Sequence, residues 1–552
     1  MIVTLDYPTS DPAYIYAIGG ENEPFELYDY VLITNKDKHW IGQIKKPNIN
    51  ISAISGIAPF DPPLLHALNL SQQIPDTPLQ ILNSTEKWEI FLMGEFNAQT
   101  NILQTLRRRP KPSALVTKLD RERTIKVLNL PTVQAFQDKT YNIIGILENA
   151  DNVPLCITPT ILNHHIMVSG GTGSGKSNAC ANIIFQAAKY GYCTILYDAK
   201  PDYRLMDEAN SEKKVAPIFE RFEQYHHTRQ PAKRIKRVCF YNGDKRDYNN
   251  YDAVLGFTAS DLDPYLFSNL FLPDTASEMQ FEEFYGACYL LREQMFEGKR
   301  RFYTLQNILS TLEHKQQEYL EKKDSPGASP VGAVIRNIRR KIEKNSYPWL
   351  DKVDAAIPSK NAFESQRKVE KFDPERLIEA GAIIHVDMNS FVDDSDYALF
   401  LGVFFKECQK YRRDKTHTIP VLQFVDEAHR IFDNVSRHSK QLDGIFNRTM
   451  REGRTLSHGV VLSLQNANQI PANVMNNINS HIVMRQNSLE IAKSATQAMG
   501  KDEAAMTISL PPGQALAKMF ESSSVILAQM SPSPFELERT DNKQRIIDRG
   551  LA

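Results

Sequence analysis

One short segment constrains the fold of this chain more than any other part of the sequence. It satisfies the pattern G-x-x-x-x-G-K-[ST] and comprises Gly170, Gly171, Thr172, Gly173, Ser174, Gly175, Lys176 and Ser177. A strand-like run precedes it at His165–Ser169, and a helix-like run begins within it at Lys176–Tyr190. The glycines let successive backbone N–H groups turn toward one anion, and the helix N-terminus adds partial positive charge. The segment therefore predicts a phosphate-binding loop between a strand and a helix.

The loop predicts a nucleotide as its ligand. Lys176 is expected to bridge the β- and γ-phosphates of ATP, and the Ser177 hydroxyl is expected to ligate Mg²⁺. The expected nucleotide-binding residues are Gly171, Thr172, Gly173, Ser174, Gly175, Lys176, Ser177 and Asn178. Hydrolases, small-molecule kinases and nucleotide-gated switches all use such loops, so a second motif is needed to separate them.

That second motif is an apolar strand-like run at Val421–Val425 that ends in two acids, Asp426 and Glu427. Asp426 is expected to hold the Mg²⁺ ion, and Glu427 is expected to polarise the water that attacks the γ-phosphate. Adjacent acids in this position favour hydrolysis over phosphoryl transfer to a small molecule. The two motifs together predict a Mg²⁺-dependent ATP hydrolase.

Four further polar side chains are candidates for the same site. Gln465 follows a strand-like run at Gly459–Leu464, where it either senses the γ-phosphate or is an ordinary loop residue. Arg451 and Arg454 precede that run; one of them either neutralises transition-state charge, in its own or a neighbouring subunit, or belongs to a surface ion pair. Asp198 follows another strand-like run and either supports the site or forms a turn.

The remaining pattern predicts an α/β fold with two additions. Residues 1–135 contain short strand-like runs and a linker, which is typical of a small β-barrel or sandwich. Residues 136–258 and 376–535 alternate strands with helices and predict a parallel sheet. Residues 259–375 have helical periodicity and predict an all-helical insertion that splits the α/β unit, and residues 536–552 form a tail.

One segment near the end of the N-terminal region is rich in basic side chains. They are Arg107, Arg108, Arg109, Lys111, Lys118, Arg121, Arg123 and Lys126. The segment is either a solvated linker with the last barrel strands, or a patch that contacts phosphates or another subunit.

Composition excludes several classes of protein. With 552 residues, 42% of them apolar, the chain can bury a core for three or four units and is not disordered. The formal net charge of −1 excludes a histone-like polycation, so nucleic-acid contacts need local basic patches. The six cysteines are scattered, no signal peptide is evident, and no apolar run approaches the roughly 18 residues of a membrane span. We therefore expect a cytoplasmic protein that makes no membrane contact.

The order of the motifs resembles the HerA family of hexameric, ATP-driven DNA translocases in the HerA/FtsK group. The resemblance rests on His165–Ser177, on Asp426–His429, on Arg451–Arg454 and on Ser463–Gln465, and it extends to Asn479–Arg485 and Leu510–Ala515. Two positions depart from the family pattern. His164 stands where an arginine is common, and Asn466-Ala467 replaces a common Arg-Pro pair, which weakens the sensor assignment of Gln465.

The resemblance implies a RecA-like core with a helical bundle inserted in it and an N-terminal barrel of the ATP-synthase type. It also implies ATP bound between subunits of a hexameric ring, an arginine acting in trans from Arg451 or Arg454, and double-stranded DNA in the central pore. Family members act with a nuclease in DNA-end resection, or with a nuclease or a sirtuin-like effector in antiviral defence.

Three functional hypotheses stay open from the sequence. The first is a ring ATPase that translocates or remodels double-stranded DNA. The second is an ATP-dependent ring scaffold that assembles and activates a defence effector, with translocation secondary. The third, a conjugation-type coupling ATPase, is weaker because such proteins usually carry membrane helices.

Overall fold

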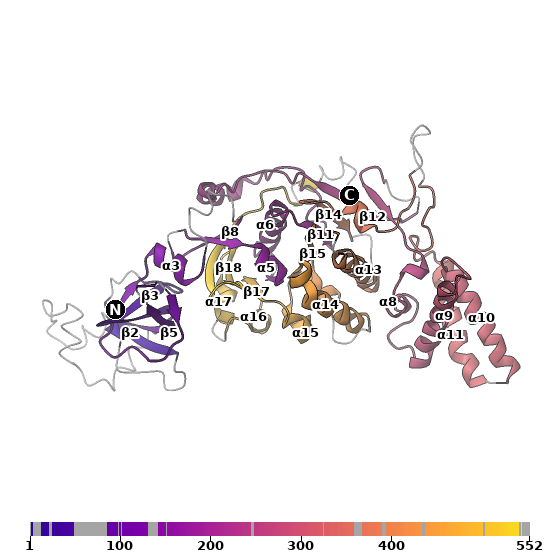
Figure 1. The fold of residues 1–552 in the computed structure, drawn as a ribbon, viewed down its shortest axis with the longest axis horizontal. Coiled ribbons are helices and arrows are strands. Elements are labelled where there is room, and N and C mark those ends of the chain that lie inside the picture. Colours follow the sequence, from indigo (N-terminus) through magenta and orange to yellow (C-terminus); the bar gives the residue numbers. More distant parts are fainter. Residues whose placement is uncertain are drawn as a thin grey trace.

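The computed structural model describes residues 2–3, 13–20, 25–48, 85–97, 99–100, 102–130, 142–150, 152–243, 248–323, 325–357, 367–388, 394–414, 416–432, 437–500, 503–539 and 542–543. The molecule is elongated (Figure 1). A small β domain occupies the N-terminal end, a mixed sheet flanked by helices forms the middle, and three long helices stand at the other end.

The N-terminal strands form a closed antiparallel barrel. They are β1 (Ile2–Val3), β2 (Tyr14–Gly20), β3 (Tyr30–Asn35), β4 (Lys38–Asn48), β5 (Thr85–Asn97), β6 (Ile102–Gln104) and β7 (Leu115–Lys118). Their order is β2-β1-β7-β3-β4-β5-β6, and an additional pairing between β2 and β5 closes the ring, with β6 outside it. Inward-facing side chains such as Ile33, Trp40 and Ile90 fill the barrel, and α3 (Arg121–Val127) follows it.

The middle of the molecule contains a twelve-stranded sheet, of which eight strands are parallel. The parallel strands, in spatial order, are β13 (Ala253–Leu255), β12 (Ile235–Phe240), β14 (Ile383–Asp387), β11 (Cys193–Asp198), β15 (Val421–Val425), β16 (His458–Leu464), β10 (Ile166–Ser169) and β17 (Ser480–Met484). Most of these strands are buried along their whole length, because helices cover both faces. This order places β16 between β10 and β15, which carry the two main sequence motifs.

The other four strands extend the sheet antiparallel. They are β18 (Gln514–Lys518), β19 (Ile526–Met530), β8 (Asn142–Leu147) and β9 (Pro154–Ile157). The pattern over residues 136–258 predicts a parallel sheet, and for β8 and β9, the first two strands of this range, that prediction is wrong. β8 pairs antiparallel with β9 and β19, because a short connection to the neighbouring strand permits a hairpin but not a parallel crossover.

Helices cover the two faces of the sheet. On one face lie α5 (Pro159–Asn163) and α6 (Lys176–Lys189), whose core is continuous with barrel side chains such as Tyr30. On the other face lie α13 (Asp394–Arg413) and α14 (Arg437–Leu456). The shorter helices are α7 (Ala216–Phe222), α12 (Pro374–Leu377), α15 (Ala472–Met475), α16 (Leu489–Ala495) and α17 (Glu503–Ser509).

The insertion consists of α8 (Pro264–Ser268), α9 (Glu278–Phe296), α10 (Leu305–Glu321) and α11 (Ser325–Glu343). Capping boxes begin α9 at Ser277 and α10 at Thr304, where each side chain accepts a hydrogen bond from the third helical N–H. After α11 the chain returns to the core through isolated β-bridges at Leu350, Ala356 and Glu370. The Trp349 ring contacts Phe400 of α13 with centroids 4.7 Å apart, so the insertion shares the core of the sheet domain.

The predicted fold class is confirmed: an α/β core with an N-terminal β-barrel and an all-helical insertion. The domain boundaries given above stay a prediction. None of the described helices combines the length and the apolar character needed to cross a membrane.

Candidate active site at the phosphate-binding loop

The phosphate-binding loop connects β10 to α6, and two glycines give it its shape. Gly173 has φ +74° and Gly175 has φ +97°, a region that residues with a Cβ atom rarely adopt. The Gly171 N–H donates to the Arg485 carbonyl at 2.8 Å, and the Gly513 N–H donates to the Ser174 carbonyl at 2.8 Å. The segments that follow β17 and precede β18 therefore brace the loop.

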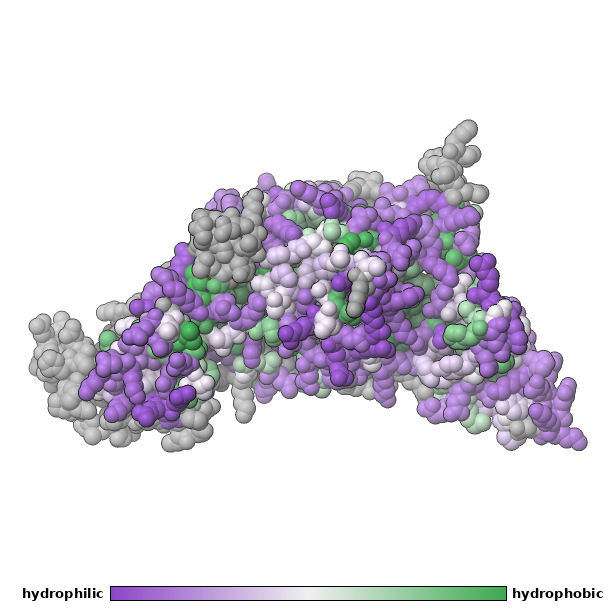
Figure 2. Space-filling model, viewed as in Figure 1, coloured by the Kyte–Doolittle hydropathy of each residue, from purple (hydrophilic) through white to green (hydrophobic). Residues whose placement is uncertain are grey.

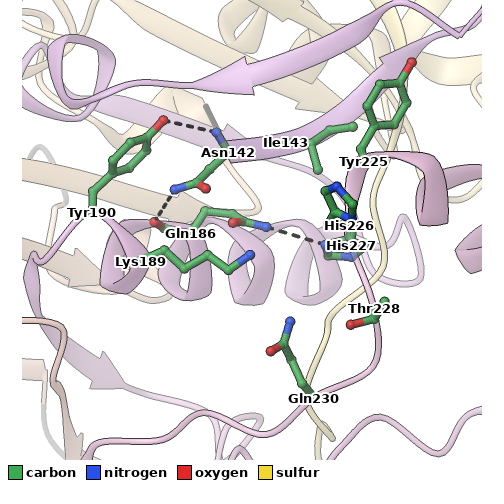
Figure 3. Close-up of a pocket in the computed structure, with 10 residues that line it drawn as sticks. All are labelled: Asn142, Ile143, Gln186, Lys189, Tyr190, Tyr225, His226, His227, Thr228 and Gln230. Carbon is green, nitrogen blue, oxygen red and sulfur yellow. Dashed lines mark hydrogen bonds between the residues drawn. The ribbon is translucent and has the colours of Figure 1, made fainter. Parts of the chain in front are cut away.

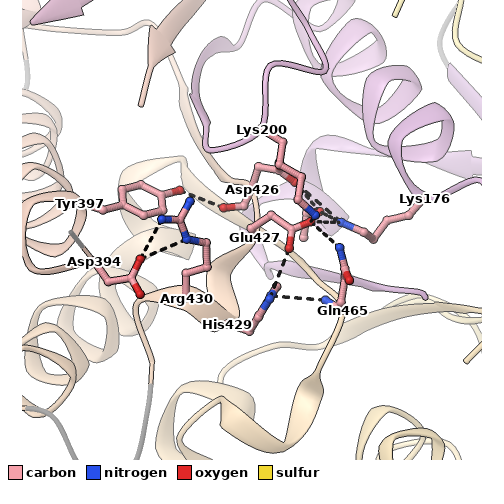
Figure 4. Close-up of polar contacts among 10 residues, drawn as sticks. Lys176, Lys200, Asp394, Tyr397, Asp426, Glu427, His429, Arg430 and Gln465 are labelled. Carbon is pink, nitrogen blue, oxygen red and sulfur yellow. Dashed lines mark hydrogen bonds and ion pairs between the residues drawn. The ribbon is translucent and has the colours of Figure 1, made fainter. Parts of the chain in front are cut away.

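Lys176 is buried at the start of α6 and points at the two predicted acids (Figure 4). Its Nζ donates to Ser463 Oγ at 2.8 Å and lies 3.4 Å from Glu427 Oε1 and 3.8 Å from Asp426 Oδ1. Burial opposes the charge of Lys176, but the neighbouring carboxylates outweigh burial and raise its pKa. Lys176 is therefore a fixed cation at the loop, as the sequence pattern predicted.

Two oxygen groups near Lys176 fit Mg²⁺. Ser177 Oγ donates to Asp202 Oδ2 at 2.7 Å, and Asp426 Oδ1 accepts from Ser463 Oγ at 2.8 Å. Among the described residues no three His, Cys, Asp or Glu side chains are grouped as a metal cage. Mg²⁺ commonly uses one or two protein oxygens and completes its shell with water and substrate phosphates. The Ser177 and Asp426 oxygens therefore suit an ion that arrives with a nucleotide.

Glu427 lies directly after β15, in the left-handed region at φ 49°, and only 3% of its surface is exposed. Its Oε1 accepts from Lys200 Nζ at 2.8 Å and from Gln465 Nε2 at 2.9 Å, and its Oε2 lies 3.3 Å from His429 Nε2 (Figure 4). Burial acts to raise the pKa of Glu427, but the charges of Lys176 and Lys200 and the Gln465 amide lower it to about 2. Glu427 is therefore an ionised carboxylate whose two oxygens are both occupied by protein groups.

Gln465 reaches this site because of strand order. It follows β16, which lies between the strand of the phosphate-binding loop and the strand of the acids. The carboxyl ends of parallel strands meet at one edge of a sheet, so the three motifs converge there.

Asp198 lies at the end of β11, beside β15, and is buried. Its Oδ2 accepts from His385 Nε2 at 2.8 Å and from the Tyr203 N–H at 3.3 Å. Burial, and then the charges of Asp426 and Asp202, raise its pKa well above the usual range. Asp198 makes no hydrogen bond to the loop and instead holds the turn that carries Lys200 and Asp202.

Arg451 and Arg454 lie at the opposite edge of the sheet. The α14 residues around them pack against the beginnings of β10 and β16: His165 Nε2 donates to the Met450 carbonyl at 2.8 Å, and the Val460 N–H donates to His165 Nδ1 at 3.1 Å. The phosphate-binding loop follows the other end of β10. Both arginines are exposed and form no ion pair with a described residue. The structure therefore does not bring them to the loop of their own subunit.

Three functional positions received no role from the sequence. Asp202 contacts Ser177, Lys200 contacts Glu427, and Arg485 Nη2 lies 3.5 Å from the Gly173 carbonyl. Their positions after strands could have indicated a role at the site. Lys200 and Asp202 follow the strand that pairs with β15, and Arg485 follows a strand that pairs with β10. The side-chain oxygen of Asn178, a predicted nucleotide-binding residue, accepts from the Ser533 N–H at 3.1 Å.

A separate pocket of about 480 Å³ lies at the far end of α6 (Figure 3). Asn142, Gln186, Lys189, Tyr190 and His227 are among the residues that line it. Lys189 ends the helix that Lys176 begins, so this pocket is not part of the phosphate site.

Two family models match the chain. "Helicase HerA, central domain" matches residues 142–407, which include the phosphate-binding loop. "Zonular occludens toxin (Zot)" matches residues 402–519, which include Asp426, Glu427 and Gln465. No curated protein matches the sequence.

Several solved structures resemble the chain at low identity. VirB4 of Thermoanaerobacter pseudethanolicus is 12% identical, with 71% of this chain and 96% of that chain covered and a TM-score of 0.47. The plasmid coupling protein TrwB in complex with ADP and Mg²⁺ is 11% identical, with 73% and 95% covered and a TM-score of 0.44. The genome packaging NTPase B204 from Sulfolobus turreted icosahedral virus 2 is 12% identical, with 28% and 71% covered and a TM-score of 0.21.

These TM-scores are below 0.5, so the assignment rests on the family model and on the geometry of the loop. The phosphate-binding loop, Lys176 and the ionised Glu427 meet at the carboxyl edge of the sheet. The loop and Lys176 lie within the match to the HerA central domain, and Glu427 lies in the segment after it. Residues 142–407 are therefore similar to the central domain of HerA helicases, and the site is that of a P-loop ATPase of the HerA/FtsK type, an ATP-hydrolysing enzyme.

Proposed function

We propose that this chain forms a hexameric, Mg²⁺-dependent ATPase ring that translocates or remodels double-stranded DNA together with a nuclease or another effector. One observation carries the proposal. The hydrolytic groups gather at the carboxyl edge of the sheet, while the arginines that such a reaction needs are exposed at the opposite edge and form no ion pair with the residues that the structure describes. A ring of identical subunits packed head to tail would join the two edges.

Each residue of the site has a role in this proposal. Lys176 and the loop from Gly171 to Asn178 hold the phosphates, and Ser177 and Asp426 hold Mg²⁺, which would neutralise charge on the β- and γ-phosphates. Glu427 orients and deprotonates the attacking water, and Gln465, 2.9 Å from Glu427, reports the presence of the γ-phosphate.

Removing either of two charged groups tests the hydrolytic site. Lys176→Ala is expected to abolish both ATP binding and hydrolysis, and Glu427→Ala is expected to abolish hydrolysis but to retain binding. Equilibrium binding of a fluorescent ATP analogue and release of phosphate measure the two steps. The matched control is Lys214→Ala, an exposed lysine outside the site. Unimpaired hydrolysis in either site variant would overturn the proposed roles.

Mixing two inactive variants tests the ring. A site with an intact Glu427 needs arginines only from its neighbour if Arg451 or Arg454 acts in trans. We therefore expect Glu427→Ala protein mixed with the double variant Arg451→Ala/Arg454→Ala to regain hydrolysis that neither shows alone. Because the variants cannot complement one another if the arginines act in cis, the absence of any regained activity in rings shown to exchange subunits would contradict the proposal.

DNA binding is supported by local basic groups rather than by net charge. Arg336 and Arg340 are exposed on α11 and form no ion pair with a described residue. Such groups suit sequence-independent contacts to phosphates. We expect double-stranded DNA to stimulate ATP hydrolysis by the isolated protein, and the stimulation to weaken as salt is raised. An ATPase rate that is indifferent to DNA would count against translocation.

A second candidate function is an ATP-dependent scaffold that assembles and activates an effector, such as a nuclease or a sirtuin-like enzyme of antiviral defence. The observation that favours it is a set of exposed apolar side chains on the insertion: Met279, Tyr289, Leu290, Phe296 and Phe302. Figure 2 shows a mainly hydrophilic face on which hydrophobic residues form small separate patches, one of them over the end that carries α9–α11. Contact with a partner protein would remove these apolar side chains from water. An ATPase rate that changes with the protein partner but not with DNA would favour the scaffold.

We also propose a cytoplasmic place of action. All six cysteines are buried free thiols, as expected for a chain that folds in a reducing compartment. Reaction of the unfolded chain with a thiol reagent should therefore label six cysteines without prior reduction, and fewer labelled cysteines would contradict this.

A further inference from the structure

Lys200 contacts the proposed catalytic carboxylate but has no role in the site described so far. It lies in the turn after β11, and its Nζ is 2.8 Å from Glu427 Oε1, the shortest of the contacts to that oxygen (Figure 4). The Lys200 side chain is 48% exposed, whereas that of Glu427 is 4% exposed. Lys200 therefore approaches the acid from the solvent side and can leave without disturbing the core.

The other cation at Glu427 lacks this freedom. The Lys176 side chain is 9% exposed and is tied to Ser463 and Asp426. The backbone under Lys200 is also fixed, because its carbonyl accepts from the Asp202 N–H at 2.6 Å and because Asp198 holds the Tyr203 N–H. The Lys200 side chain can therefore move while the hydrogen bonds of its turn stay in place.

The Oε1 atom of Glu427 has no room for a water while its protein contacts persist. Its Oε1 accepts from Lys200 and Gln465 with Lys176 at 3.4 Å, and its Oε2 faces His429. A carboxylate acts as a general base only when one oxygen is within hydrogen-bond reach of the attacking water. The contacts of Lys200 and Gln465 therefore block Oε1 of Glu427.

We propose that Lys200 is a positioning residue that responds to the γ-phosphate: it holds Glu427 when no triphosphate is bound, and it transfers to the γ-phosphate when ATP binds, which frees Glu427 Oε1 for water. This inference rests on the proposed role of Glu427 as the group that activates water. In this inference, binding of the γ-phosphate itself releases the carboxylate oxygen that activates water.

The charges at the site support this exchange. Two ammonium groups, those of Lys176 and Lys200, share one carboxylate oxygen in the structure. A γ-phosphate held by Lys176 brings more negative charge and more acceptor oxygens than one carboxylate, and charge-assisted contacts of this kind are strong. ADP lacks the γ-phosphate, so with ADP bound Lys200 stays on Glu427.

Hydrolysis by three variants provides the first test. Lys200→Met removes the charge at similar length and is expected to lower kcat about tenfold or more, the size of one lost charge-assisted hydrogen bond. Lys200→Arg keeps the charge and should recover much of that loss, which a merely structural role of the side chain would not explain. Lys214→Met, on an exposed lysine elsewhere, should match the wild type. An unchanged kcat in Lys200→Met would overturn the inference.

A double-mutant cycle provides the second test, with AMP-PNP·Mg²⁺ and ADP·Mg²⁺ as probes. Glu427→Gln removes the group that restrains Lys200, so it should tighten AMP-PNP binding several-fold more in the Lys200 background than in the Lys200→Met background. Binding of ADP should show no such difference. If Glu427→Gln acted only by removing repulsion between Glu427 and the γ-phosphate, AMP-PNP binding would tighten as much or more in the Lys200→Met background. That result would contradict the transfer of Lys200 from Glu427 to the γ-phosphate.

Different results would contradict the catalytic role of Glu427 and the positioning role of Lys200. Glu427→Gln protein that hydrolyses ATP at the wild-type rate would overturn the proposed function itself. If Glu427→Gln is inactive but the cycle shows no coupling with Lys200 that depends on the γ-phosphate, the hydrolytic site stands and the role of Lys200 falls.

Discussion

Ser463 connects the cation and the metal-binding acid of the active site. Its Oγ accepts from Lys176 Nζ at 2.8 Å and donates to Asp426 Oδ1 at 2.8 Å, and the residue is fully buried in β16. Because the Ser463 hydroxyl contacts both Lys176 and Asp426, its loss removes one hydrogen bond from each of these charged groups. Hydrogen bonds to charged groups contribute about 1.5–3 kcal/mol each.

We therefore expect Ser463→Ala to lower kcat/KM for ATP by about tenfold or more while the protein stays folded. Steady-state hydrolysis and the thermal midpoint measure the two effects. Ser310→Ala, on the exposed face of α10, is the control, because Ser310 bonds only to the Gln306 carbonyl of its own helix. Ser463→Ala protein with wild-type kinetics would contradict the connecting role.

At the residue scale, the active-site residues that belong to a recognisable sequence motif could be predicted, whereas those outside such a motif could not. Lys176 and Glu427 were predictable because a glycine-rich loop and an apolar strand ending in acids have few other interpretations. The sequence predicts no role for Ser463, because that role depends on Lys176 contacting it across the site. The contacts of Lys200 and Asp202 depend on a turn whose shape is set by Asp198 and the buried His385, far apart in sequence.

At the scale of elements, α14 decides where the two arginines lie. Gly453 is buried on this helix, and a Cβ atom there would meet the His458 carbonyl and His165 Cε1, the latter at 2.7 Å. Gly444, on the same helix, is exposed with nothing within 4 Å of its Cβ position. The close approach of α14 to β10 and β16 therefore requires a glycine at only one of the two positions.

Substituting alanine at each position should change stability in opposite directions. Gly444→Ala gains helix propensity and should raise the free energy of unfolding by about 0.5–1 kcal/mol. Gly453→Ala should lower it by about 1–3 kcal/mol, because the helix must shift to admit the methyl group. Thermal midpoints measure both variants. A stabilised Gly453→Ala protein would show that α14 is not held against the sheet as described.

Element types were largely predictable, whereas pairing was not. The run at Val421–Val425 and the run that ends at Asp198 are short, apolar and bounded, and both form buried strands, β15 and β11. The antiparallel edge formed by β18, β19, β8 and β9 was not predicted, because β8 pairs with β19, which lies near the other end of the described chain at Ile526–Met530. Local patterns carry no information on such long-range register.

At the scale of the whole molecule, four buried histidines set how stability depends on pH. They are His165, His227, His458 and His481, and burial is the main cause that lowers the pKa of each, to about 4, 4, 3 and 4. In the unfolded chain their pKa is about 6.5. Between these values the unfolded state binds more protons than the folded state, so stability is fully present above pH 6.5 and is lost as the pH falls toward 4.

Each of these histidines should cost about 2 kcal/mol of stability at pH 5 relative to neutral pH, since a pKa difference of one unit corresponds to 1.36 kcal/mol. Buried carboxyl groups such as Asp198, with a raised pKa, act in the opposite direction and reduce the total. His227 suits this measurement, because its ring nitrogens contact two neutral groups, the Pro532 carbonyl at 2.9 Å and the Gln186 amide at 3.5 Å, and its ring stacks on Phe219 away from the active site. We expect the thermal midpoint to fall from pH 7 to pH 5, and His227→Gln to reduce that fall, whereas His314→Gln, with a side chain 75% exposed, should leave it unchanged. A fall that is equal in all three proteins would mean that His227 is charged in the folded state, and the burial that isolates it from water would then have to be incomplete.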